Sequence, residues 1–283
     1  MNVQTILQQL DRYYQQDEHT RIEPFLLENI DKAQAANDKA TALTLLNELM
    51  GYYRGMSRFQ ESITIANKAV ALLEEMGYKG TIPYATTLLN VATAYRADGQ
   101  IGKAIELYEE VIRIYNSQRQ TDVYLMASLY NNLSLAYQEL DDHAKAIQFL
   151  EQALPLIKSL PDSDVEVAVT YTNMALSKIK CARLPEAKAD LLQAAGLFEA
   201  HTPLNSHYGA ALAGLGEIAY REGNTQEAIT RYERALSELL PHYGKNLYYA
   251  ITLGSLAVVY EDVDQVKSQA LAEEARQIQA ALQ

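Results

Sequence analysis

Apolar and small residues recur along the chain with the spacing of an α-helix, in pairs of segments separated by short polar breaks. Residues 85–112 read ATTLLNVATAYRADGQIGKAIELYEEVI, and residues 127–154 read ASLYNNLSLAYQELDDHAKAIQFLEQAL. The two stretches agree at the apolar and small positions on which helix packing depends. This agreement indicates an internal repeat whose unit is a pair of helices.

One small residue just inside the second helix of each pair marks the period of the repeat. The series is Ser62, Ala104, Ala146, Ala187 and Ala228, with spacings of 104−62=42, 146−104=42, 187−146=41 and 228−187=41. One helical pair cannot bury its apolar face alone, so a fixed period in this range predicts units that stack on their neighbours.

The pattern therefore predicts an all-α fold, a right-handed superhelical α-solenoid of about seven helical pairs. The predicted pairs are residues 1–36, 39–76, 82–117, 123–160, 164–200, 206–240 and 246–281. We expect residues 1–283 to form a single solenoid, in which residues 1–38 are a degenerate N-terminal pair, residues 39–245 hold five clear repeats and residues 246–283 are a degenerate last pair or cap. This division leaves no room for a separate catalytic or DNA-binding domain.

Some local features depart from the repeat. Pro24 should lie in the first turn of its helix, where the missing N–H costs nothing, whereas Pro155 should kink its helix or end it early. Cys181 is expected to be a small buried residue. Residues 261–269 lack a clean break and an alanine at the helix crossing. Residues 270–283 are interpreted as a solvated capping helix or, alternatively, as the point where a longer chain was cut.

The repeat resembles the tetratricopeptide repeat. The resemblance is carried by a large residue late in the first helix, an alanine at the crossing and an alanine on the second helix: Tyr95 or Tyr137, Ala104 or Ala146, and Ala153 or Ala235. The usual repeat has about 34 residues, so the longer period implies helices about one turn longer. This longer form is similar to the repeats of kinesin light chains and of bacterial peptide-sensing regulators.

A second resemblance covers residues 40–140. There the stretches LTLLNELMGYYR, IPYATTLLNVATAYR and ASLYNNLSLAYQE are similar to the amino-terminal repeat region of larger proteins of Gram-positive bacteria. In those proteins the repeats precede a nucleotidyltransferase-like domain of unknown role. That domain has no counterpart in this sequence, so the resemblance implies no catalytic residue here.

Composition narrows the possible partners. The formal net charge of −12 argues against nucleic acid, whose binders carry a basic patch or stripe. No apolar run approaches the roughly 20 residues of a membrane helix, so we expect no membrane contact and a cytoplasmic location. A single cysteine excludes a disulfide framework and a cysteine-based zinc site. His201 and His207 with Glu199 could bind a metal only by chance folding of one loop, and the remaining histidines, His19, His143 and His242, are each alone in turns. We therefore predict no metal, no cofactor and no enzyme activity.

Asparagines recur in the first helix of successive pairs. Asn90, Asn132 and Asn173 are spaced by 132−90=42 and 173−132=41 residues, and Asn47 and Asn131 lie one position earlier in their helices. An amide donates and accepts hydrogen bonds at once, and the resemblance to kinesin light chains and peptide sensors implies that these side chains hold a ligand backbone in the concave groove. Alternatively, they bridge neighbouring helices of the solenoid.

Basic residues lie about two turns further along the same helices. Arg54, Arg96, Lys180 and Arg221 should lie close to the lip of the groove, where they could attract an anionic ligand such as a peptide carboxylate. The alternative is that they are solvated cations at helix C-termini, where the helix dipole favours positive charge.

Together these features predict an interaction module that binds a protein or peptide ligand in its groove. The alternative is a regulatory or targeting module that acts in cis or in trans on a nucleotidyltransferase-like enzyme. The sequence identifies neither the ligand nor the oligomeric state. The segment Gly214-Leu215-Gly216 follows no predicted strand and fits a close helix crossing better than a phosphate loop.

Overall fold

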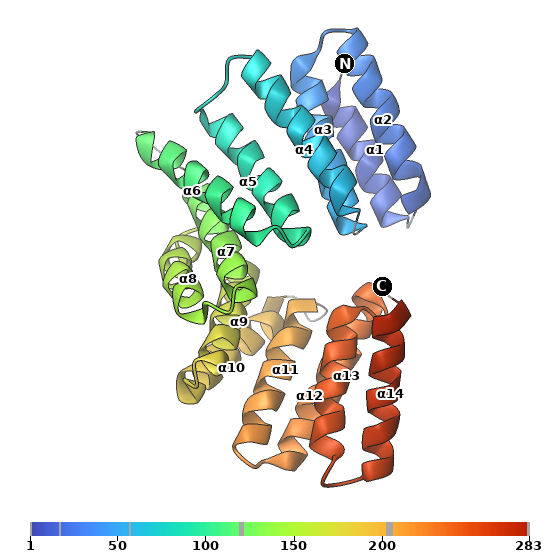
Figure 1. The fold of residues 1–283 in the computed structure, drawn as a ribbon, viewed down its shortest axis with the longest axis vertical. Coiled ribbons are helices and arrows are strands. Elements are labelled where there is room, and N and C mark those ends of the chain that lie inside the picture. The colour runs from blue at the N-terminus through green and yellow to red at the C-terminus, as the bar shows by residue number, and fades with distance from the viewer. Residues whose placement is uncertain (1, 17, 57, 119–121, 202–205, 282–283) are drawn as a thin grey trace. The chain divides into compact units, whose positions relative to one another are not determined.

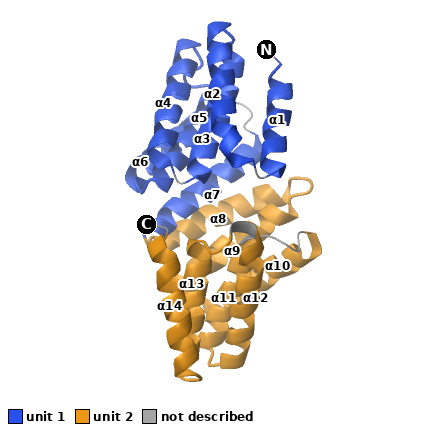
Figure 2. Ribbon diagram, turned by 90° about the vertical axis from the view of Figure 1, so that its right-hand side faces the viewer, with its two compact units in different colours: residues 1–140 blue, residues 141–283 orange. Residues whose placement is uncertain are grey.

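The computed structural model of the protein describes residues 2–16, 18–56, 58–118, 122–201 and 206–281. Across these ranges it contains fourteen α-helices and no β-strand (Figure 1). The predicted all-α architecture is confirmed, and the helix pairs fall within a few residues of the expected ranges. The chain divides into two compact units, residues 1–140 and 141–283 (Figure 2). That the chain forms a single solenoid domain stays a prediction.

Among its described residues, the first unit holds seven helices. They are α1 (Val3–Gln15), α2 (His19–Ala35), α3 (Lys39–Gly55), α4 (Phe59–Glu75), α5 (Ile82–Ala97), α6 (Ile101–Ser117) and α7 (Val123–Glu139). Each helix packs against the next in sequence, and α5 also contacts both α3 and α7. The odd-numbered helices α3, α5 and α7 are therefore direct neighbours, as the stacking of helical pairs requires.

The second unit also holds seven helices within the described residues. They are α8 (His143–Lys158), α9 (Asp164–Lys180), α10 (Leu184–His201), α11 (Ser206–Arg221), α12 (Thr225–Tyr243), α13 (Leu247–Tyr260) and α14 (Gln265–Ala281). Here α11 contacts both α9 and α13 in addition to its sequence neighbours. None of the helices in the described part of either unit is both long enough and apolar enough to cross a membrane.

The small residues that mark the repeat period are buried in the core. Ala104, Ala146, Ala187 and Ala228 are fully buried, and so is Ser62. The Ser62 hydroxyl donates to the carbonyl oxygen of Met50 on the preceding helix at 2.9 Å, so its burial leaves no unpaired polar group. The same crossing position in the last pair holds Ser268, 268−228=40 residues after Ala228 and also buried. The last pair therefore has a small crossing residue after all.

The short breaks between paired helices use left-handed backbone conformations. Gly99 and Gly223 have φ of 79° and 80°, the region that glycine adopts without steric cost. The equivalent break between α9 and α10 uses Ala182 instead, with φ of 58°. An alanine in this region is strained, because its Cβ approaches the following carbonyl oxygen.

Two local predictions were wrong, and one of two options was excluded for a third. The helix α2 begins at His19, before the expected start, so Pro24 lies inside it and not in its first turn. Pro155 lies inside α8, which continues to Lys158, so the helix does not end early there and the kink stays a prediction. Both prolines are exposed, where water can hydrate the carbonyl group that loses its partner. Cys181 is exposed because it is the C-cap of α9 and not part of the buried face.

The last pair also corrects an expectation. Its two helices are separated by a break after Tyr260, and α14 runs over Gln265–Ala281, so residues 270–281 are part of the second helix of the pair, and residues 282 and 283 lie outside the described residues. The close crossing expected at Gly214-Leu215-Gly216 is confirmed. A Cβ on Gly214 would lie 2.9 Å from Cδ1 of Leu191, and one on Gly216 would lie 3.0 Å from the ring of Tyr232.

Candidate functional site

The predicted site residues of the first unit lie on its odd-numbered helices α3, α5 and α7. The first amide contact joins α3 and α5: Asn90 Nδ2 donates to Asn47 Oδ1 at 3.3 Å. Asn47 Nδ2 in turn donates to the carbonyl oxygen of Leu43, one turn earlier, at 3.0 Å. Both asparagines are half-buried. The amide of Asn47 is thus fixed by its own helix and presents its oxygen to the next repeat.

A second polar contact joins α5 and α7. The hydroxyl of Thr93 lies 3.3 Å from Asn132 Oδ1, and Asn132 Nδ2 donates to the carbonyl oxygen of Ser128 at 2.9 Å. The Thr93 hydroxyl also lies 2.9 Å from the carbonyl oxygen of Leu89. Because it has one proton, Thr93 donates to one of these two oxygens at a time.

The expected asparagines thus take part in bridges between neighbouring helices in the first unit. Asn131 is also half-buried on α7, and Asn173 is half-buried on α9 in the second unit. An amide has two N–H donors and two acceptor lone pairs, so Asn47, Asn90 and Asn132 keep capacity for a further partner beside the contacts above. The bridging contacts and ligand binding are therefore compatible, and the ligand-binding role stays a prediction.

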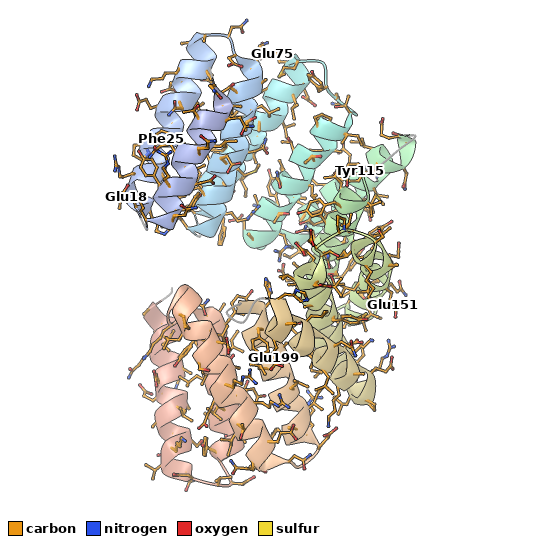
Figure 3. All side chains as sticks on the ribbon, turned by 180° about the vertical axis from the view of Figure 1, so that it is seen from behind. Glu18, Phe25, Glu75, Tyr115, Glu151 and Glu199 are labelled. Atoms are coloured by element: carbon orange, nitrogen blue, oxygen red, sulfur yellow. The ribbon has the colours of Figure 1, made fainter. Side chains whose placement is uncertain are left out.

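Two buried tyrosines have their hydroxyls next to threonines of α5. Tyr108 and Tyr115 lie on α6 and are fully buried, with their hydroxyls 3.1 Å from Thr93 Oγ1 and 3.5 Å from Thr86 Oγ1. Figure 3 labels Tyr115 on this helix. Burial raises the pKa of both phenols, so they stay protonated and can donate. Neither tyrosine was singled out from the sequence.

A signal for these contacts exists in the sequence. Thr86 and Thr93 are 93−86=7 residues apart, and Tyr108 and Tyr115 are 115−108=7 residues apart. Seven residues are about two helical turns, so each pair lies on one face of its helix and the two faces can meet.

The basic residues divide into two groups. Arg54 is half-buried on α3, and Arg96 on α5 forms an ion pair with Glu139 on α7. Lys180 is exposed at the end of α9, and Arg221 donates to Glu217 one turn earlier on α11 at 2.5 Å. Lys180 and Arg221 thus have the surroundings of solvated helix ends, whereas Arg54 and Arg96 share a partly buried location.

Burial and charge both act on the first group. Burial lowers the pKa of the Arg54 guanidinium, and the nearby charge of Arg96 lowers it further, while Tyr108 acts in the opposite direction. Burial also raises the pKa of the Glu139 carboxyl, against the effect of Arg96. The guanidinium groups of Arg54 and Arg96 and the phenol of Tyr108 therefore lie close enough to influence one another.

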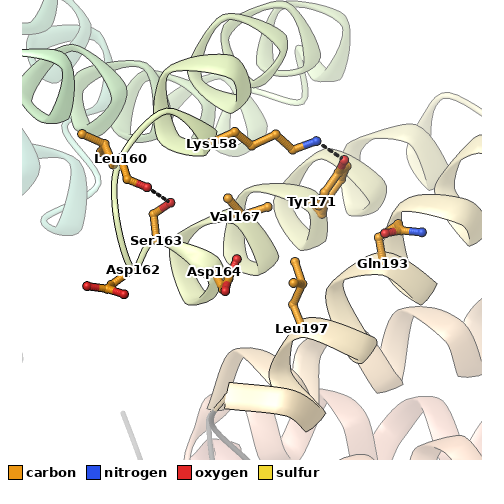
Figure 4. A pocket seen from close by; sticks show the side chains of 9 residues that line it. All are labelled: Lys158, Leu160, Asp162, Ser163, Asp164, Val167, Tyr171, Gln193 and Leu197. Atoms are coloured by element: carbon orange, nitrogen blue, oxygen red, sulfur yellow. Dashed lines mark hydrogen bonds between the residues drawn. The ribbon is translucent and has the colours of Figure 1, made fainter.

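A separate pocket of about 310 Å³ lies in the second unit (Figure 4). Within it Lys158 Nζ donates to the Tyr171 hydroxyl at 2.7 Å, and the Ser163 hydroxyl lies 2.9 Å from the carbonyl oxygen of Leu160. None of the residues singled out from the sequence lines this pocket. No group of three or more histidine, cysteine or carboxylate side chains in the described ranges is arranged to hold a metal ion.

The repeat geometry agrees with family models. Models of the tetratricopeptide repeat match residues 38–117, 83–159 and 211–247, which together cover more than half of the chain. The chain belongs to the tetratricopeptide repeat proteins. Its resemblance to kinesin light chains is also confirmed: Protein KINESIN LIGHT CHAIN-RELATED 3 of Arabidopsis thaliana is 23% identical over 237 residues, which are 82% of this chain and 36% of the relative. The chain thus spans about a third of the length of the curated relatives it matches.

Solved structures share the fold at low sequence identity. BtubC (BKLC) from P. vanneervenii has a TM-score of 0.62 and 22% identity, over 79% of this chain and 92% of its own. NprR, solved in complex with its cognate peptide NprX, has a TM-score of 0.64 and 16% identity, over 96% of this chain and 76% of its own. These likenesses confirm the predicted solenoid fold.

Proposed function

We propose that this protein is an interaction module that binds an extended peptide, or an extended segment of a partner protein, along its odd-numbered helices. The single observation that carries the proposal is the row of amides on α3, α5 and α7. Asn47, Asn90 and Asn132 are half-buried, linked from helix to helix and still able to form further hydrogen bonds.

The fixed orientation of the amides favours binding. Asn47 and Asn132 each use one N–H on a carbonyl oxygen of their own helix, so their side chains lose little rotamer freedom when a ligand arrives. A peptide backbone offers one N–H and one carbonyl oxygen per residue, and an amide can pair with both kinds of group. Recognition of this type reads the extended backbone more than the side chains.

The relatives support a binding role without naming the partner. NprR binds a peptide, and its fold spans nearly the whole of this chain. We extend the proposal to Asn131, Arg54 and Arg96 as further ligand contacts of the first unit, and to Asn173, Lys180 and Arg221 as ligand contacts of the second unit. The proposal includes no catalytic step, no cofactor and no nucleic-acid partner. It places the protein in the cytoplasm. The regulatory alternative, control of a nucleotidyltransferase-like enzyme, has no support among these relatives and stays a prediction.

The test compares two triple variants. Asn90→Ala, Asn132→Ala and Asn173→Ala together remove the proposed contacts, whereas Asn67→Ala, Asn116→Ala and Asn224→Ala remove three exposed asparagines outside the odd-numbered helices. Partners would be captured from native lysate with the wild-type chain, and a peptide from a captured partner would be titrated by fluorescence anisotropy.

Three lost hydrogen bonds of about 0.5–1.5 kcal/mol each predict binding weaker by about tenfold to a thousandfold or more, with the control triple near wild type. Melting temperatures of both triples are measured alongside. If the first triple melts far below the control while the folded fraction binds as tightly as wild type, the asparagines are structural bridges and the proposal fails.

A further inference from the structure

The first unit contains an unbalanced cluster of charge at the ends of α3, α5 and α7. We call it the arginine cluster and define it as Arg54, Arg96, Tyr108 and Glu139. Arg54 and Arg96 are equivalent residues of successive repeats, 96−54=42 positions apart, in the last turns of α3 and α5. Since these two helices contact each other, the repeat places Arg54 and Arg96 at neighbouring helix ends, close enough for the charge of Arg96 to act on Arg54.

Arg96 is partly satisfied within the chain. Its Nη1 donates to Oε1 of Glu139, the last residue of α7. Its Nε is buried and makes no hydrogen bond within the described residues. Only 18% of the Arg96 side chain is exposed, so this guanidinium is largely buried with its Nε–H unused. A buried donor without a partner is unfavourable, and an incoming acceptor that rearranges the cluster can satisfy it.

Arg54 has no carboxylate partner within the described residues. It is half-buried beside Arg96 and Tyr108, so its charge is partly removed from water without compensation. The cluster therefore has two guanidinium groups, one neutral phenol and a single carboxylate. This leaves one positive charge uncompensated in a protein whose net charge is −12.

A role as helix-end cations does not explain this arrangement. Lys180 shows that a cation at a helix C-terminus can remain exposed, where the favourable dipole effect carries no burial cost. Burying two guanidinium groups beside each other costs both desolvation and mutual repulsion. An arrangement that is unfavourable in the free protein becomes favourable once an anion binds between the two groups.

Glu139 is a poor permanent partner for Arg96. It is the C-terminal residue of α7, where the negative end of the helix dipole disfavours a carboxylate. Its side chain is 39% exposed, so it can turn into solvent when a stronger anion arrives. Burial also raises its pKa, which means that its charged form is not well stabilised where it lies.

We propose that the arginine cluster is a binding subsite for an oxyanion, a carboxylate or a phosphate carried by the ligand, and that Glu139 occupies it as a tethered competitor in the free protein. The ligand oxyanion contacts both Arg54 and Arg96 and displaces Glu139 from Arg96. Two adjacent guanidinium groups present several N–H donors, the geometry that carboxylates and phosphates accept. The identity of the carrier as a groove-bound peptide rests on the function proposed above, whereas the subsite itself does not.

The experiment uses the full chain labelled with ¹⁵N-arginine. Sodium acetate and inorganic phosphate are titrated in separate series, with chloride replaced to hold the ionic strength constant, and the arginine Nε–H signals are followed by NMR. The signals are assigned with Arg54→Gln and Arg96→Gln. We expect the Arg54 and Arg96 signals to shift together and to saturate, while exposed Arg113 on α6 stays unchanged. Saturation in acetate identifies a carboxylate subsite, and tighter binding of phosphate than of acetate identifies a phosphate subsite. The proposal is overturned if neither series gives a saturable shift.

The competitor is tested with a matched pair of variants. Glu139→Gln removes the carboxylate from the cluster, and Glu109→Gln removes an exposed one from α6, with the same change in net charge. Glu139→Gln should tighten oxyanion binding by about threefold or more relative to Glu109→Gln, because an ion pair of this exposure no longer competes. Equal affinities in the two variants would show that Glu139 does not compete.

The result is separable from the proposed function. The small oxyanions are also titrated into the Asn90→Ala, Asn132→Ala, Asn173→Ala triple. If that triple loses its peptide but keeps the oxyanion response, both proposals hold. If peptide binding depends on the asparagines and neither arginine signal responds to acetate or phosphate, the oxyanion subsite alone is wrong.

Discussion

Asn90 donates a hydrogen bond from its side-chain amide to the amide oxygen of Asn47, 43 residues earlier in the chain. This contact joins two successive repeats through polar groups, in addition to the apolar contacts between them. Since each of the two side chains is half-buried, the bond lies between the core and the surface. Such a bond contributes both to the alignment of α3 with α5 and to the polar row proposed to bind a ligand.

The contribution of this bond to stability can be measured with a double-mutant cycle. Asn47→Ala, Asn90→Ala and the double variant would be unfolded in urea. A net coupling energy of about 0.5–1.5 kcal/mol is expected, because the bond is between neutral groups and partly shielded from water. Additive effects of the two substitutions would show that the contact does not stabilise the folded chain.

The repeat register is tested at the helix crossings. Ala104 is fully buried where α5 and α6 pack, so Ala104→Leu should overpack the crossing and lower the free energy of unfolding by about 1–3 kcal/mol. Ala144→Leu is the control, because Ala144 is exposed on α8 and its substitution should have little effect. Equal melting temperatures for the two variants would contradict the burial of Ala104.

The strained turn between α9 and α10 predicts a stabilising substitution. Ala182 has φ of 58°, and its side chain is exposed, so Ala182→Gly relieves steric strain without opening a cavity. We expect the free energy of unfolding to rise by about 1 kcal/mol. A left-handed backbone costs an alanine about 1–2 kcal/mol, and part of the relief is offset because glycine makes the unfolded chain more flexible.

The control for this substitution is Ala71→Gly, at an exposed position inside α4. There glycine should destabilise by roughly 0.5–1 kcal/mol, because it loses more backbone entropy on helix formation. Thermal unfolding of both variants measures the difference. Destabilisation of similar size in both would contradict the left-handed conformation of Ala182.

An ion pair between α2 and the start of α4 predicts acid sensitivity. Glu23 accepts hydrogen bonds from Arg58 at 2.5 and 3.2 Å and from the Tyr53 hydroxyl at 2.8 Å. The hydrogen bond from Arg58 is the main cause that lowers the pKa of Glu23 below its ordinary 4.5. Because the folded-state pKa is the lower one, this contribution to stability is present above the unfolded-state pKa and is lost as the pH falls through the folded-state pKa.

The expected difference is in the slope of stability against pH. Glu23→Gln should lose less stability than wild type between neutral pH and the region below pH 4.5, since it has no carboxylate to protonate there. Glu28→Gln is the matched control, because Glu28 is an exposed residue of the same helix and forms an ion pair with Lys32. Urea unfolding across the pH range gives both slopes, and parallel curves for wild type and Glu23→Gln would contradict the assignment.

The fold could be predicted from the sequence because the repeat is strict at its crossing positions. Alanine or serine at a period of 41–42 residues fixed both the number of helical pairs and their approximate ends. The exceptions have local causes. Pro24 and Pro155 lie on exposed helix surfaces that tolerate a missing hydrogen bond, and the serine at the last crossing, Ser268, falls one or two residues short of the period.

The site was less predictable because its contacts depend on side-chain direction. Asn47 lies one position off the register of Asn90, and the two amides nevertheless meet across adjacent helices. The series of asparagines was visible in the sequence, but their bonds to one another and to Thr93 were not. Tyr108 was hidden for a different reason: its ring fills the core as any repeat tyrosine does, and only its hydroxyl reaches the polar row.

The helix α5 takes part in both polar bridges, through Asn90 to α3 and through Thr93 to α7. In a repeat protein each unit is coupled mainly to its nearest neighbours, so unfolding can begin in one pair and stop there. A ligand that lies across all three helices would add a direct coupling between α3 and α7, which are not sequential neighbours. Binding would then make the first unit unfold in a single steeper transition, and local opening of α5 would no longer be independent of the helices on its two sides.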